Sequence, residues 1–173
     1  MSVDKNDILK ERARKLALRK HDEISDSKQF MNAVLFKING QLYGIDSQYV
    51  INITKTARCF PIPCTPPHVL GISSIRGKIV AVINFASLNG ISSVQTNEHS
   101  TIIVAGNSEI EFAFYVDKIE SNKQLFESEI QNNTANLEKM NKKGWIKAIT
   151  TDGIILFDIK KILSDETLIV DIN

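Results

Sequence analysis

All four prolines of this 173-residue chain lie between residues 61 and 67, and no other feature constrains its fold as strongly. Proline fixes the backbone φ angle and lacks an amide hydrogen, so this segment can be neither a helix nor a central strand. A tight turn at Arg76-Gly77 follows, and then an apolar run rich in β-branched residues, 79–85. We expect a stiff extended loop that leads through this turn into a buried strand.

Turn-forming residues at two other places predict β-hairpins. Asn39-Gly40 separates residues 30–38 from residues 41–46, and Thr151-Asp152-Gly153 separates residues 145–150 from residues 154–157. Asn-Gly and Asp-Gly are typical of tight hairpin turns. Many short strands with little helix predict a mainly β fold of barrels or a sandwich, rather than a parallel sheet.

The two ends of the chain differ from this central part. Residues 4–20 carry apolar side chains at helical spacing and predict an amphipathic helix, and residues 1–22 contain seven Lys and Arg against four Asp and Glu. This helix either lies on the domain through its narrow apolar stripe or docks a partner. We therefore divide the chain into a basic helix and linker (1–24), a central domain (30–165), and a C-terminal strand or tail (166–173).

Charge and cysteine content exclude several classes of protein. The net charge of +1 gives no bulk attraction to nucleic acid or to an anionic membrane. No apolar run approaches the roughly 18 residues of a membrane-spanning helix, and the charged N-terminus does not resemble a secretory signal. Two cysteines do not form a disulfide framework. These features predict a soluble cytoplasmic protein.

No motif predicts an enzyme, a cofactor or a metal site. Cys59, Cys64 and His68 are the best candidates for zinc ligands, but a structural zinc site needs four ligands and a second matching pair is absent. The segment Gly71–Gly77 lacks both phosphate-binding glycine patterns. From the residues alone, a small-molecule or nucleic-acid-binding β-barrel remains an alternative to an interaction module.

The order of several motifs resembles the CheW family of bacterial chemotaxis coupling proteins. These motifs are Leu42-Tyr43-Gly44-Ile45-Asp46, Val50-x-x-Ile53, Pro61-x-Pro63, and the run from Val69 through Gly71-Ile72 and Ile75-Arg76-Gly77 to Phe85. Residues 102–104, 116–119 and 153–163 also match the later strands of the family, so the resemblance covers about residues 30–165.

The resemblance implies two five-stranded β-barrel subdomains, similar to Src-homology barrels, around a shared apolar core. It also implies a non-enzymatic adaptor that bridges the cytoplasmic tip of chemoreceptors and the regulatory domain of the histidine kinase CheA. The partner-binding residues would be Val50, Asn52, Ile53, Arg76, Gly77, Ile102 and Ile103. Arg76 either faces the partner or braces its own turn. Asn52 stands where the family carries an acidic residue, and Ala81 and Asn84 replace its Pro and Asp.

Overall fold

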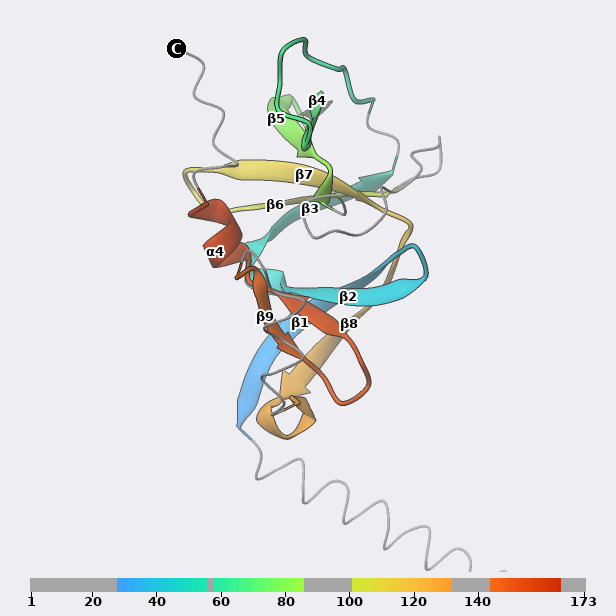
Figure 1. The fold of residues 1–173 in the computed structure, drawn as a ribbon, viewed down its shortest axis with the longest axis vertical. Helices are drawn as coiled ribbons and strands as arrows, with labels where there is room; N and C mark the ends of the chain where they lie inside the picture. The colour runs from blue at the N-terminus through green and yellow to red at the C-terminus, as the bar shows by residue number, and fades with distance from the viewer. Residues whose placement is uncertain (1–27, 56–57, 86–100, 132–143, 166–173) are drawn as a thin grey trace, which may run out of the picture.

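The computed structural model describes residues 28–55, 58–85, 101–131 and 144–165, which form two five-stranded β-sheets (Figure 1). The elements along the chain are β1 (Gln29–Ile38), β2 (Gln41–Asp46), η1 (Ser47–Tyr49), β3 (Val50–Lys55), β4 (Val69–Ile75), β5 (Lys78–Ile83), β6 (Thr101–Gly106), β7 (Glu111–Val116), β8 (Lys118–Phe126), η2 (Glu127–Glu129), β9 (Ile146–Ile149), β10 (Ile155–Phe157) and α4 (Ile159–Leu163).

Sheet A joins strands from both ends of this described chain. β1 and β2 pair antiparallel around Asn39 and Gly40, whose positive φ angles of 50° and 79° suit a tight hairpin turn. β10 pairs with β2 in parallel and β8 pairs with β1, so the strand order is β8-β1-β2-β10-β9. The blue and the orange-red strands of Figure 1 therefore share one sheet.

Sheet B consists of consecutive strands in the order β3-β6-β7-β5-β4. It has the same arrangement as sheet A: a central antiparallel hairpin, a parallel neighbour on one side, and outer antiparallel strands. In this arrangement, β3, β4, β5, β6 and β7 correspond to β8, β9, β10, β1 and β2. The two sheets are thus related by a circular permutation of strand order.

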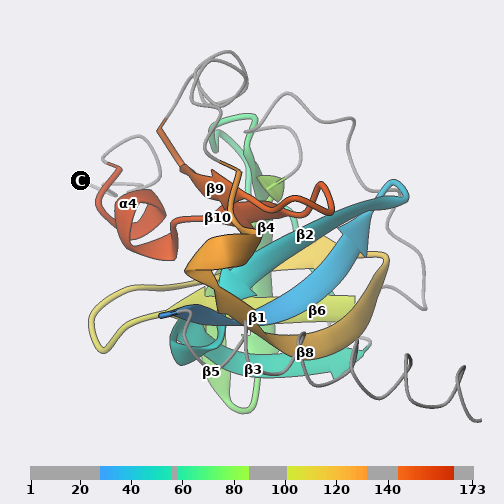
Figure 2. The ribbon, with the colours of Figure 1, turned by 90° about the horizontal axis from the view of Figure 1, so that it is seen from below.

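A short bridge joins the two edges of each sheet. Ile130, which follows β8, bridges to Thr150 beyond β9, and Phe60, which follows β3, bridges to Ile72 in β4. The Phe60 N–H donates to the Ile72 carbonyl at 2.7 Å, and the Ile72 N–H donates to the Phe60 carbonyl at 2.9 Å. Closure leaves fewer unpaired strand edges. We call the two closed sheets barrel A and barrel B; Figure 2 shows how the strands of barrel A curve.

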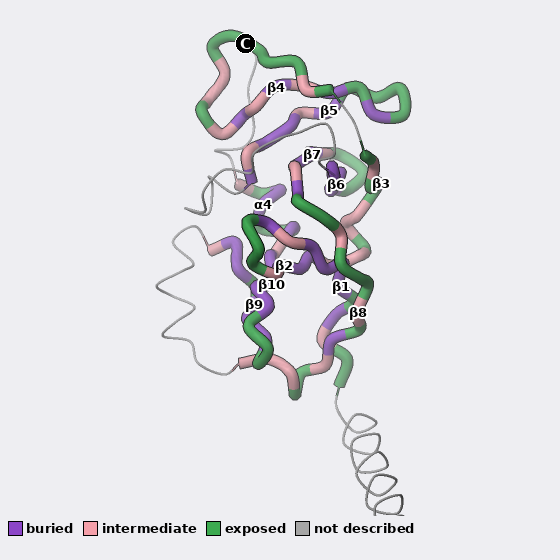
Figure 3. Tube along the Cα trace, turned by 90° about the vertical axis from the view of Figure 1, so that its right-hand side faces the viewer, coloured by how far each residue is buried: buried purple, intermediate pink, exposed green. Residues whose placement is uncertain are grey.

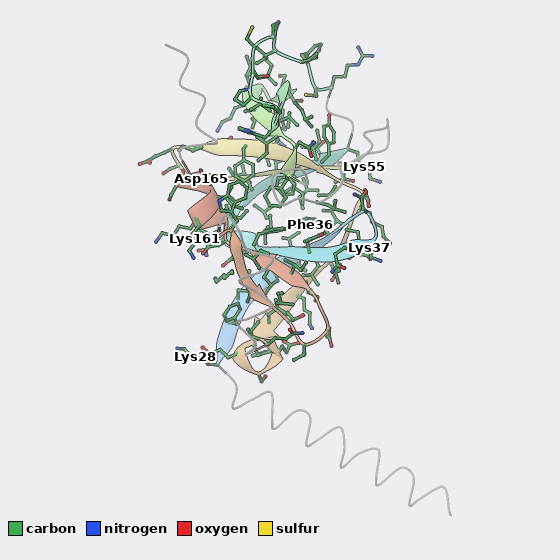
Figure 4. All side chains as sticks on the ribbon, viewed as in Figure 1. Lys28, Phe36, Lys37, Lys55, Lys161 and Asp165 are labelled. Atoms are coloured by element: carbon green, nitrogen blue, oxygen red, sulfur yellow. The ribbon has the colours of Figure 1, made fainter. Side chains whose placement is uncertain are left out.

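The largest core cluster lies between the two barrels. Phe36 of β1 approaches Phe114 of β7 with ring centroids 5.6 Å apart, and Figure 4 shows Phe36 between the sheets. Separate apolar clusters, which include Leu35 in barrel A and Val82 in barrel B, fill the two interiors. Figure 3 shows that buried residues follow the strands, whereas turns are largely exposed.

The structure agrees with the predicted mainly β fold of two five-stranded units and with both predicted hairpins. One local prediction was wrong: Ile79 lies in β5, as expected, but is 74% exposed. The predicted N-terminal helix (4–20) and the predicted C-terminal strand or tail (166–173) lie outside the described residues. None of the helices described is long and apolar enough to cross a membrane.

Candidate partner-docking surface

A β-bulge in β3 places Val50 and Ile53 on the same face of barrel B. Val50 pairs with Ala105 and Ile53 pairs with Ile103, while Ile51 is left without a partner between Val50 and Asn52. Side chains alternate along a regular strand, so residues three apart normally face opposite sides. The unpaired Ile51 adds one residue to β3, so Val50 and Ile53 come to lie on the same face. Val50 packs against the core between the barrels, and Ile53 is 39% exposed beside that core.

Asn52 faces the interior of barrel B rather than a partner. It pairs with Val104, which belongs to the interior cluster, and directly paired residues point to the same side of a sheet. Asn52 is only 9% exposed, and its Nδ2 atom is buried without a hydrogen-bond partner. Ser73 of β4 is also buried, and its Oγ atom has no partner. Such unpaired groups are uncommon in folded proteins.

Ile102 and Ile103 are both 0% exposed, so neither can form the wall of an open groove in this fold. β6 is buried along its whole length because both of its faces are covered. Ile102 packs inside barrel B, whereas Ile103 packs between the barrels. The two residues therefore belong to the packed strand β6 that pairs with β3.

Arg76 and Gly77 form the two-residue turn between β4 and β5, with Ile75 opposite Lys78. Their φ angles of 52° and 80° are both positive, as a type I′ hairpin turn requires. Arg76 is exposed and, among the residues that the structure describes, forms no side-chain hydrogen bond or ion pair. The strand directions place this turn at the end of barrel B where β3 begins. The guanidinium is therefore available to a partner.

An apolar face that the sequence pattern does not predict lies beside this turn. Ile79 is 74% exposed, and Ile110, just before β7, is 38% exposed. β5 and β7 pair in parallel with Ala81 opposite Phe112, which places Ile79 and Ile110 in neighbouring positions two residues earlier. The ion pair between Lys78 and Glu111, with N and O atoms 2.7 Å apart, agrees with this alignment. An apolar residue in a strand has the same sequence pattern whether it is buried or exposed, so only the fold reveals this face.

Charge and apolar exposure are distributed unequally over the two barrels. The six large apolar side chains exposed in the described residues all belong to barrel B or its connections: Ile51, Ile53, Phe60, Ile62, Ile79 and Ile110. No acidic residue occurs between Asp46 and Glu98, whereas Lys55, Arg58 and Arg76 carry positive charge there. Four of the five ion pairs described lie on barrel A and the segments that flank it. Barrel B therefore presents an apolar surface with unpaired positive charge.

The described residues contain no group of three or more His, Cys, Asp and Glu side chains that could hold a metal ion. Burial raises the pKa of the Cys59 thiol, which disfavours the thiolate that would bind metal. Burial, with a smaller contribution from Cys59, also raises the pKa of Tyr115.

A shallow hollow beside α4, lined in part by Trp145 and Asp165, lies outside both barrels. The Trp145 Nε1 atom donates a hydrogen bond to Asp165 there at 2.9 Å.

Known proteins share this sequence pattern and fold. Residues 32–167 match the model of the CheW-like domain. A chemotaxis protein CheW from Thermotoga maritima is 28% identical over 148 residues, which cover 84% of this chain and 95% of that protein. A chemotaxis protein CheW from Bacillus subtilis is 24% identical over 106 residues, or 61% of this chain and 68% of that protein. The crystal structure of a CheW scaffolding protein from Thermoanaerobacter tengcongensis superposes with a TM-score of 0.64 at 25% identity, covering 74% of this chain and 88% of that one.

Proposed function

The chain belongs to the CheW family, and on this premise we propose that it is a non-enzymatic adaptor that couples chemoreceptors to a CheA-type histidine kinase. An adaptor of this kind acts through surfaces rather than through a reaction centre. The observation that carries the proposal is the concentration of exposed apolar side chains on barrel B, next to Arg76. Its proposed place of action is the cytoplasmic side of a receptor array.

The docking surface consists of Val50, Ile51 and Ile53 of β3 together with Arg76 at the β4–β5 turn. Apolar side chains at the centre of an interface supply most of its binding free energy, and a charged rim fixes the orientation of the partner. Among the described residues Arg76 forms no ion pair, so we propose that its complement is a carboxylate or a carbonyl of the partner. The chemoreceptor tip is the partner that we assign to this surface.

An adaptor that bridges two proteins needs a second surface. Ile79 and Ile110 form an apolar face on β5 and at the start of β7, beyond the part of sheet B that barrel A covers. We assign this face to the regulatory domain of the kinase. The alternative of a small-molecule-binding or nucleic-acid-binding barrel is not favoured, because apolar side chains fill the interiors of both barrels in the described residues.

A pull-down with two purified probes tests this function. The probes are the regulatory domain of a CheA-type kinase and the cytoplasmic fragment of a chemoreceptor. We expect the full chain to retain both, and the Arg76→Ala variant to lose the receptor fragment while remaining folded. Lys160→Ala is the matched control, because it removes an exposed cation from α4, distant in sequence from the docking surface. If the wild-type chain retained neither probe, the adaptor function would be rejected.

The same probes address the basic segment 1–24, for which we propose partner docking. A chain that lacks these residues should bind one of the probes more weakly. Unchanged binding, together with unchanged thermal stability and localisation, would contradict the proposed docking role and indicate a dispensable segment.

A further inference from the structure

Three consecutive residues of β3 each point to the side of the sheet that suits their side chain less well: Ile51 and Ile53 to solvent, and Asn52 to the apolar interior. Ile51 and Ile53 are 44% and 39% exposed, whereas Asn52 between them is buried with an unpaired Nδ2 atom. Apolar side chains normally occupy the interior of a barrel, and a buried amide normally finds a hydrogen-bond partner. The mismatch concerns every residue from 51 to 53, which points to the strand register rather than to a single side chain.

The position of the bulge sets this arrangement. The observed register pairs Val50 with Ala105, leaves Ile51 unpaired, and continues with Asn52 opposite Val104. A shift by one residue turns every side chain to the opposite face. If the extra residue were Thr54 instead, Ile51 would pair with Val104 and Ile53 with Ile102, both of which face the interior of barrel B.

This shifted register corrects all three mismatches and leaves the strand ends in place. Ile51 and Ile53 enter the interior, and the Asn52 amide moves opposite Ile103, to the partly exposed position that Ile53 holds in the observed register. Val50 stays opposite Ala105 and Lys55 stays opposite Thr101, as in the observed register. Two isoleucines are larger than the Asn52 and Thr54 side chains that they replace in the interior, and this crowding opposes the shift.

The place of β3 at the edge of sheet B lowers the barrier to such a shift. β6 is its only hydrogen-bonded strand neighbour in the described structure, so a movement of the bulge rearranges a single ladder. A strand held on both sides would have to break two ladders at once. Edge strands are also where bulges are most common.

We propose that β3 exchanges between these two registers, and that partner docking selects the one with the bulge at Ile51. That register presents Ile51 and Ile53 to the partner, whereas the shifted register withdraws both side chains into barrel B. β3 is then a switch that sets the fraction of molecules able to dock. The docking part of this inference rests on the proposed adaptor function, but the exchange itself does not.

Nuclear magnetic resonance of the isotopically labelled full chain tests the exchange without any partner. We expect millisecond exchange at the amides of residues 51–54 and 102–104 in the wild type, and no such exchange in Asn52→Val. Valine at this position fills the interior and leaves no unpaired amide, so it holds the observed register. Asn52→Lys should have the opposite effect, because a buried lysine is unfavourable; its cross-strand contacts should join Ile51 to Val104 and Ile53 to Ile102.

Ser128→Lys is the control for added charge, because Ser128 is exposed in η2 of barrel A. Wild-type β3 without exchange, with the same contacts as Asn52→Val, would overturn the proposal even if Asn52→Lys failed to fold. An Asn52→Lys variant that folds and keeps residue 52 opposite Val104 would overturn it as well.

Binding of the receptor fragment then tests the selection step. Locking the docking register should tighten binding by the inverse of its population, about twofold if the two registers are equally populated. Asn52→Val is therefore expected to bind more tightly than the wild type, and Asn52→Lys more weakly. If exchange is observed but Asn52→Val binds with unchanged affinity, selection by the partner is rejected. If no chain binds the fragment, receptor docking at this surface is rejected, whereas an exchange observed by nuclear magnetic resonance still stands.

Discussion

Gly71 lies directly against the backbone of Phe60, at the point where barrel B closes. A Cβ atom at position 71 would overlap with the carbonyl oxygen of Phe60, and the φ angle of Gly71 is +147°. The same carbonyl accepts the hydrogen bond from the Ile72 N–H. A glycine without a side chain therefore permits the contact that joins the loop after β3 to β4.

We expect Gly71→Ala to destabilise the protein by about 2–3 kcal/mol, because the added methyl group displaces Phe60 and strains the backbone. The control is Gly40→Ala, since Gly40 also has a positive φ but a Cβ atom added there would meet no other atom within 4 Å. That change should cost only about 1 kcal/mol of backbone strain. Urea unfolding of both variants gives the comparison, and equal losses would show that the contact with Phe60 contributes nothing.

Arg76 stands at a turn position that asparagine or glycine usually occupies. Replacing it with asparagine creates an Asn-Gly turn, for which a positive φ angle is less strained. We expect Arg76→Asn to raise the free energy of unfolding by up to about 1 kcal/mol while weakening receptor binding. Urea unfolding and calorimetric titration measure the two effects. A loss of stability would contradict the interpretation that Arg76 is retained for binding.

Ile53 and its cross-strand neighbour Ile103 should respond to substitution in opposite ways. Ile53→Glu places a charge on an exposed position and should change stability by no more than about 0.5 kcal/mol, while abolishing docking. Ile103→Ala opens a cavity at a fully buried position and should cost about 2–5 kcal/mol. Thermal unfolding combined with the pull-down separates the two roles. Equal destabilisation by both variants would disprove the assignment of Ile53 to the surface.

Barrel A should lose stability in acid through two glutamates. Side-chain hydrogen bonds from Lys118 and Lys37 lower the pKa of Glu120 below its ordinary 4.5. For Glu129, burial raises the pKa, but a side-chain hydrogen bond from Lys123 and the backbone N–H of Phe126 outweigh it, so the net shift is downward.

A lowered pKa in the folded state means that the unfolded chain binds the proton more readily. The stabilisation is therefore complete above about pH 4.5 and disappears as the pH falls through the lower folded-state values. We expect Glu129→Gln to reduce the dependence of the unfolding midpoint on pH below this value. Urea midpoints recorded from about pH 7 to about pH 3 measure it; parallel curves for variant and wild type would refute the contribution of Glu129.

Local turn chemistry explains why most strands were predictable. Asn39-Gly40 and Asp152-Gly153 mark hairpins through the positive φ angles that these residues accept. The resemblance to a known family added the two-barrel arrangement. The bridges that close the barrels join residues such as Phe60 and Ile72 through backbone atoms, and backbone pairing leaves little trace in side-chain patterns.

The candidate site was predicted less completely than the fold. Val50, Ile53 and Arg76 lie where an interface can use them, but the bulge that brings Val50 and Ile53 to one face has no local sequence signal. Ile102 and Ile103 were expected among the partner-binding residues, and only the packing of both faces of β6 shows that they are internal. Ile79 was assigned to the core because an apolar strand residue has the same sequence pattern whether it faces a core or a partner.

The circular relationship between the two barrels has a consequence for synthesis. All strands of barrel B lie within residues 50–116, so a growing chain can complete it while β8, β9 and β10 are still missing. β1 and β2 emerge first but have to wait for those last strands, one of which pairs Phe157 with Ile45 across more than half of the chain. Premature termination before β10 should therefore leave a formed barrel B joined to an open sheet β8-β1-β2, whose β2 edge is unpaired and prone to aggregation, so the last strand decides whether a newly made molecule is released intact or removed by proteolysis.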